Sequence, residues 1–166
     1  MSRDPAFKAR VHAALEARIA ADLAAVAWSQ ADSQSGATHA ESRPEHAKDT
    51  RSVESSYLAR GLAERVVELR KAADRLDGFE QRVFGSGEGV ALSALVCLED
   101  EEDALRRLYY LAPTGGGVKL SLEGEEITVV TPTSPIGAAL LGRTVDDGIA
   151  YHTPKGRREA TILWLI

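Results

Sequence analysis

The spacing of apolar residues changes near residue 78, and this change limits the folds open to the chain. Before it, apolar side chains recur every three or four residues, as they do along one face of an α-helix. After it, the spacing shortens towards two residues and turns become frequent, which is typical of β-strands. We therefore predict an α+β protein with a helical part over residues 1–78 and a β-sheet domain over residues 79–166.

The helical part contains two amphipathic stretches. Pro5 follows a capping residue, Asp4, and opens a predicted helix over residues 5–30. Its apolar residues are spaced 4-4-4-4-3, at Phe7, Val11, Leu15, Ile19, Leu23 and Val26. A second stretch with 4-4-3-4-3 spacing runs from Leu58 to Leu76, and Gly78 follows it as a stop signal.

A polar segment at about residues 31–52 separates these stretches, and it contains Gly36 and Pro44. Such a composition predicts a loop or frayed tip. Two helices with one apolar stripe each are expected to bury those stripes against each other. The sequence therefore predicts an antiparallel helical hairpin, or coiled coil, in which 26 residues would extend for about 39 Å.

The second half predicts a compact, mostly antiparallel sheet of five or six strands with one short helix. The expected strands cover residues 90–98, 105–111, 118–122, 127–130, 149–152 and 160–165. The helix is predicted from Pro135 to Leu141, with Ser134 as its cap. The runs 115–117 (GGG) and 154–156 (PKG) are interpreted as hairpin turns.

Charge and composition exclude several functional classes. The net charge is −5, and residues 1–78 hold 12 acidic and 12 basic residues, so residues 79–166 carry the whole excess with 13 and 8. Without a basic footprint we expect no binding to free duplex DNA. A single cysteine, Cys97, excludes an intramolecular disulfide and is expected in the core. With no bilayer-length apolar stretch and no signal-like start, we expect a cytoplasmic protein without a membrane partner.

Acidic residues gather in the polar segment between the two helical stretches. Glu45 and Asp49 are four residues apart, so they share one face if the second helix begins near Pro44. Two carboxylates on one face offer part of a ligand set for Mg²⁺. Their spacing alone favours the alternative of a solvated turn with acids at a helix N-terminus. The second acidic run, residues 99–103, is interpreted as a solvated loop.

The C-terminal third resembles the C-terminal domain of the GreA/GreB transcript-cleavage factor family. The similarity lies in residues 134–137 (SPIG), 140–143 (LLGR) and 154–156 (PKG). Residues 146–149 (DDGI) depart from the family pattern, whereas residues 49–59 resemble the family's second helix at its start. The resemblance implies an N-terminal coiled coil followed by an FKBP-like antiparallel sheet domain with one short helix.

The resemblance also implies a function. Such a factor binds bacterial RNA polymerase, inserts its coiled coil into the secondary channel and stimulates cleavage of backtracked RNA, without being an enzyme itself. Glu45 and Asp49, with Glu41 as a third candidate, would help to hold Mg²⁺ in the polymerase active centre. The chain alone would bind no cofactor and would meet the nascent RNA 3′ end only within the complex. Ser134, Pro135 and Ile136 would dock the sheet domain on polymerase.

Two alternatives stay open. Lys48 falls where the family has an acidic tip residue, and a lysine there would oppose cation binding. The helices also look shorter than those of the long family members, so a non-cleaving regulator that occupies the secondary channel is the second hypothesis. An FKBP-like sheet also suggests a prolyl isomerase, but a 5% aromatic content leaves few residues to line a proline pocket.

Overall fold

The computed structural model describes residues 4–40, 50–154 and 156–166, with side chains described for 4–32, 57–154 and 156–166. The chain divides into two compact units. One is a helical unit, Ala17–Asp74, and the other is a sheet unit that combines Met1–Glu16 with Arg75–Ile166. Among the described residues, no helix is long and apolar enough to cross a membrane.

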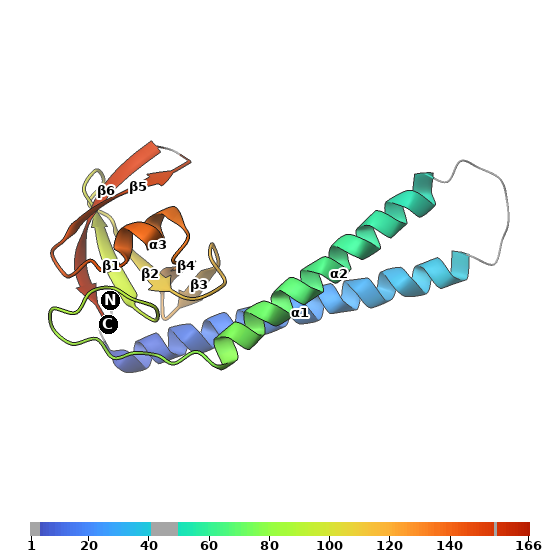
Figure 1. The fold of residues 1–166 in the computed structure, drawn as a ribbon, viewed down its shortest axis with the longest axis horizontal. Coiled ribbons are helices and arrows are strands. Elements are labelled where there is room, and N and C mark those ends of the chain that lie inside the picture. The colour runs from blue at the N-terminus through green and yellow to red at the C-terminus, as the bar shows by residue number, and fades with distance from the viewer. Residues whose placement is uncertain (1–3, 41–49, 155) are drawn as a thin grey trace. The chain divides into compact units, whose positions relative to one another are not determined.

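Two long helices, α1 (Pro5–Ala40) and α2 (Thr50–Asp77), supply the helical unit. They run in opposite directions, which confirms the predicted helical hairpin (Figure 1). The prediction of a loop from residue 31 was wrong for residues 31–40, because α1 continues to Ala40. Alanines are frequent in this segment and favour helix, whereas Gly36 alone costs only about 1 kcal/mol and residues 31–40 contain no proline.

Burial within the helical unit is uneven along the predicted apolar stripes. Ile19, Val66 and Leu69 are buried. Leu58, which belongs to the same predicted stripe of α2, is 60% exposed, and Trp28 of α1 is 71% exposed. The predicted burial of the stripes therefore holds at Ile19, Val66 and Leu69 and fails at Leu58.

The sheet unit contains six strands and one short helix, α3 (Pro135–Leu140), as predicted. The strands are β1 (Leu95–Asp100), β2 (Arg106–Leu111), β3 (Lys119–Leu122), β4 (Glu125–Val130), β5 (Gly148–Thr153) and β6 (Gly156–Leu165). Their order across the sheet is β3-β4-β2-β1-β6-β5. Residues 90–94 were expected to be strand, but they lie outside the strands and contain a turn at residues 92–93, where Ser93 has a φ of 74°.

One neighbouring pair of strands, β2 and β4, is parallel, and all the others are antiparallel. The segment between β2 and β3 is therefore a crossover loop, and the prediction of a hairpin turn at residues 115–117 was wrong. Gly115 and Gly117 have φ values of 78° and 87°, a region that glycine enters without steric cost. The predicted turn at 154–156 includes Lys155, which lies outside the described residues, and the strands on either side of it, β5 and β6, pair antiparallel.

Both faces of the sheet are covered within this unit. Leu140 of α3 belongs to the core cluster on one face, together with Val96, Leu111 and Ile162. On the other face lie the first turns of α1, where the His12 Nδ1 atom is 3.0 Å from the Tyr110 hydroxyl. Phe7, Val11 and Leu15 of these turns are fully buried.

The first turns of α1 therefore belong to the sheet unit, although the sequence assigned residues 1–78 to one helical part. The unit boundaries at residues 16 and 75 differ from a single boundary at residue 78. The physical reason is that Phe7, Val11 and Leu15 are needed to cover a sheet that is apolar on both faces.

Candidate functional site

The predicted tip residues Glu41, Glu45 and Asp49 lie outside the described residues. Their role as Mg²⁺ ligands stays a prediction from the sequence. In the part of the chain that the structure describes, no group of three or more His, Cys, Asp or Glu side chains could hold a metal ion.

The predicted docking residues form the turn that enters α3. Ser134 has extended backbone angles, φ −72° and ψ 151°, and caps the helix. Its Oγ atom accepts a hydrogen bond from the Gly137 N–H at 3.1 Å and donates one to the Thr131 carbonyl at 2.7 Å. Pro135 is exposed, whereas Ile136 packs partly against the core. Ser134 therefore has a structural task, and Pro135 is the member of the three that is open to a partner.

Gly137 completes this turn because no larger residue fits. A Cβ atom on Gly137 would lie 1.9 Å from the Thr131 carbonyl oxygen and 2.9 Å from the Ser134 Oγ atom. Real Cβ atoms do not approach other atoms this closely. The SPIG motif thus folds the loop of residues 131–134 tightly over the first turn of α3.

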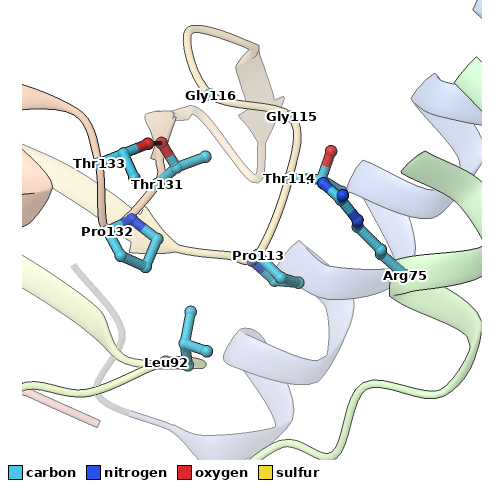
Figure 2. A pocket seen from close by; sticks show the side chains of 9 residues that line it. All are labelled: Arg75, Leu92, Pro113, Thr114, Gly115, Gly116, Thr131, Pro132 and Thr133. Carbon is cyan, nitrogen blue, oxygen red and sulfur yellow. Dashed lines mark hydrogen bonds between the residues drawn. The ribbon is translucent and has the colours of Figure 1, made fainter. Parts of the chain in front are cut away.

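An open pocket of about 600 Å³ lies beside this loop. Thr131, Pro132 and Thr133 form one wall, and the crossover loop at Gly115 and Gly116 forms another (Figure 2). A Cβ atom on Gly116 would lie 3.1 Å from the Thr131 Cγ2 atom, so glycine lets the two loops approach.

Arg75, in the last turn of α2, also lines this pocket. In Figure 2 its side chain extends towards Thr114. Sequence reasoning missed this pocket, because Arg75 falls in the predicted hairpin and the loops are distant in the chain. The only available signal was the glycine run at residues 115–117.

The acidic run at residues 99–103 is not simply a solvated loop. The Asp100 side chain is 1% exposed and accepts hydrogen bonding from the Arg158 guanidinium at 2.7 Å, with Arg107 at 3.2 Å. Burial opposes ionisation of Asp100, but the hydrogen bonds from Arg158 and the Glu102 N–H outweigh it and lower its pKa. The charge of Asp100 is therefore neutralised within the sheet unit, whereas residues 101–103 are exposed.

Asp103 joins the same network through Arg107 at 2.6 Å and Arg158 at 3.3 Å. The hydrogen bond from Arg107 is the main cause that lowers the pKa of Asp103, followed by the Leu105 N–H. Because both arginines are engaged within the unit, the network offers no free cation for a ligand. Cys97 is fully buried in β1, which confirms its expected place in the core.

Lys8 is a buried cation that the sequence did not single out. It is 4% exposed, donates a hydrogen bond to the Arg82 carbonyl and lies 5.0 Å from the centre of the Phe84 ring. Burial lowers the pKa of its ammonium group. These contacts attach residues 82–84 to the first turns of α1, and they leave Lys8 closed to an external ligand.

The sheet unit, with its tightly capped turn before α3, matches a family of transcription-factor domains. Residues 87–165 match the family described as the GreA/GreB transcription elongation factor C-terminal domain. The chain belongs to the GreA/GreB family, in agreement with the resemblance of residues 131–166.

Relatives with different names share this similarity. The transcription inhibitor protein Gfh1 of Thermus thermophilus is 35% identical over 80 residues, which are 48% of each chain. The chain thus matches about half the length of this curated relative. The transcription elongation factor GreA of Chloroflexus aggregans is 30% identical over 111 residues, which are 66% of each chain. Both an inhibitor and an elongation factor are therefore among the proteins to which this chain is similar.

A solved structure of the Gfh1 protein of Thermus thermophilus is 22% identical to this chain. The alignment covers 91% of this chain and 94% of that one, with a TM-score of 0.40.

Proposed function

We propose that this chain is an accessory factor of bacterial RNA polymerase that acts through the secondary channel and stimulates cleavage of backtracked RNA. The observation that carries the proposal is the match of residues 87–165 to the GreA/GreB C-terminal domain, in a chain that also contains a long helical hairpin. The sheet unit docks on polymerase through the exposed Pro135 and its neighbours, and the hairpin supplies the reach.

In this proposal the chemistry belongs to polymerase. Glu45 and Asp49, with Glu41 beside them, provide carboxylates to an Mg²⁺ ion that the polymerase active centre holds weakly. Such a metal activates water and stabilises the charge that develops on the RNA phosphate during cleavage. The factor contributes ligands and position, and the nascent RNA 3′ end contacts it only inside the complex.

The test uses purified bacterial core polymerase stalled in a backtracked complex with labelled RNA. Wild-type protein is expected to shorten the RNA at ample Mg²⁺. The double variant Glu45→Ala, Asp49→Ala is expected to bind polymerase with unchanged affinity and to lose cleavage. The matched control is Glu64→Ala, Glu68→Ala, which removes two acids from the exposed face of α2 and keeps cleavage. Cleavage by the tip double variant at the wild-type rate would refute the tip assignment.

A second candidate function is inhibition of polymerase without RNA cleavage. Two observations favour it: one relative is named a transcription inhibitor, and Lys48 adds a positive charge beside the tip acids. The same assay separates the two functions. An inhibitor binds polymerase and slows RNA synthesis, and it leaves the length of the backtracked RNA unchanged at every Mg²⁺ concentration.

A further inference from the structure

The pocket beside the loop of residues 131–134 is positively charged, whereas the sheet domain around it is acidic. Of the residues that the structure describes, Arg75 is the only charged one that lines the pocket, and no carboxylate does. The segment from residue 79 to 166 carries an acidic excess of 13 to 8. A basic pocket in an acidic domain selects an anionic group through electrostatic complementarity.

The pocket is lined by polar side chains that keep hydrogen-bonding or ion-pairing capacity within the described part of the chain. Among the described residues, Arg75 forms no ion pair and Thr114 forms no side-chain hydrogen bond, whereas Arg107 and Arg158 are fully engaged with aspartates. Thr131 and Thr133 bond to each other at 3.2 Å and keep further capacity, since each hydroxyl can donate once and accept twice.

The remaining walls of the pocket are apolar. Leu92, Pro113 and Pro132 contribute carbon surface to the same pocket (Figure 2). Pro132 and Thr133 precede Ser134, so the pocket is continuous with the loop that the proposed function places on polymerase. A volume of about 600 Å³ exceeds what one small anion fills, and it suits a side chain presented together with its neighbours.

We propose that this pocket receives a carboxylate side chain, Asp or Glu, from the protein on which the sheet unit docks. The guanidinium of Arg75 pairs with the carboxylate, the threonine hydroxyls donate to it, and Leu92 and Pro113 contact the aliphatic carbons beside it. This inference rests on the proposed function, because polymerase is the partner that would supply the acid.

The first experiment measures binding of the full chain to bacterial core polymerase. Arg75→Ala is expected to weaken affinity about tenfold and Arg75→Glu more strongly, because the charge is lost or reversed. Arg75→Lys should fall between wild type and Arg75→Ala, since an ammonium group keeps the charge without the bidentate geometry. Arg106→Ala is the control, because Arg106 is an exposed arginine of the sheet unit that pairs with Glu99 outside the pocket.

Equal affinity of wild type, Arg75→Ala and Arg75→Glu would overturn the inference, and so would an equal loss in Arg75→Ala and Arg106→Ala. Circular dichroism and the fluorescence of the buried Trp164 verify that each variant is folded.

A second arm separates this inference from the proposed function. The free protein is titrated with N-acetyl-glutamate and, separately, with inorganic phosphate, and the amide signals of Gly116 and Thr133 are followed by NMR. Shifts with N-acetyl-glutamate that vanish in Arg75→Ala support a carboxylate pocket even if polymerase does not bind the chain. No shift with N-acetyl-glutamate, or an Arg75-dependent shift with phosphate alone, would refute it.

Discussion

Gly137→Ala is the substitution whose cost follows most directly from the geometry. The new Cβ atom would lie 1.9 Å from the Thr131 carbonyl oxygen, so this carbonyl must turn away from α3 and from Ser134. Such overpacking costs about 1–3 kcal/mol. Movement also breaks the two hydrogen bonds that the Thr131 carbonyl accepts from Ser134, at about 1 kcal/mol each.

Alanine recovers about 1 kcal/mol of helix propensity at this position. The net loss in free energy of unfolding is therefore about 3 kcal/mol, which lowers the melting temperature of the sheet unit by about 10 °C. The assay is denaturant unfolding followed by Trp164 fluorescence in a Trp28→Phe background. Trp164 is buried in the sheet unit, whereas Trp28 is an exposed residue of the helical unit.

Gly61→Ala provides the matched control, because it is the same substitution in another helix. A Cβ atom on Gly61 meets nothing within 4 Å, so we expect stabilisation of α2 by about 1 kcal/mol, measured by thermal unfolding at 222 nm. If Gly137→Ala were as stable as wild type, or if both substitutions had the same effect, the steric reasoning would be refuted.

Three further results are expected. Hydrogen bonds lower the pKa of Asp100, so its ionised form stabilises the fold at a pH above 3.8, the ordinary pKa of this carboxyl group. This contribution is lost as the pH falls through the lower pKa of the folded state. Asp100→Asn should flatten the pH dependence of the unfolding midpoint as the pH falls below the ordinary pKa of 3.8, and an unchanged curve would contradict the assignment. Ser134→Ala should lower the free energy of unfolding by about 1 kcal/mol, measured by chemical denaturation, because the helix cap is lost. An unchanged free energy of unfolding would contradict the capping role of Ser134. Cys97 should react with a thiol reagent only after denaturation, and rapid native labelling would contradict its burial.

Local signals made much of the fold predictable. Ser134 and Pro135 mark the start of α3 because a cap and a fixed φ act within one turn of chain. The glycine at 142 marks its end for the same reason, with a φ of 75°. Strands β1 and β2 were visible as apolar runs, since both faces of the sheet are covered and alternation is weak.

Long-range pairing was not predictable from the sequence. The parallel contact of β2 with β4 brings together residues such as Tyr110 and Val129, and nothing near either residue specifies it. Asp100 looked solvated because its neutralising partner, Arg158, lies 58 residues further along the chain.

The candidate site divides in the same way. The resemblance identified Ser134, Pro135 and Ile136, whose geometry is local. The pocket next to them depends on Arg75 and Gly116, which the fold brings to one place from opposite sides of β1 and β2 in the sequence. No periodicity or motif joins two such positions, so only the structure could indicate it.

The placement of residues 1–16 in the sheet unit has a consequence for how the protein is made. In topological terms the helical hairpin is an insertion within the sheet unit, because residues of that unit both precede and follow it in the sequence. His12 leaves the ribosome 98 residues before Tyr110, whose hydroxyl its side chain contacts in the folded unit. Phe7, Val11 and Leu15 therefore stay uncovered until the strands of the sheet have been synthesised.

The same topology gives the sheet unit a high contact order, and closing so long a loop slows folding. A fragment that begins at residue 79 would lack the cover of one sheet face, since Phe7, Val11 and Leu15 are missing from it. The smallest self-sufficient version of this domain thus needs the residues on both sides of the hairpin, joined by the hairpin or by a short linker in its place.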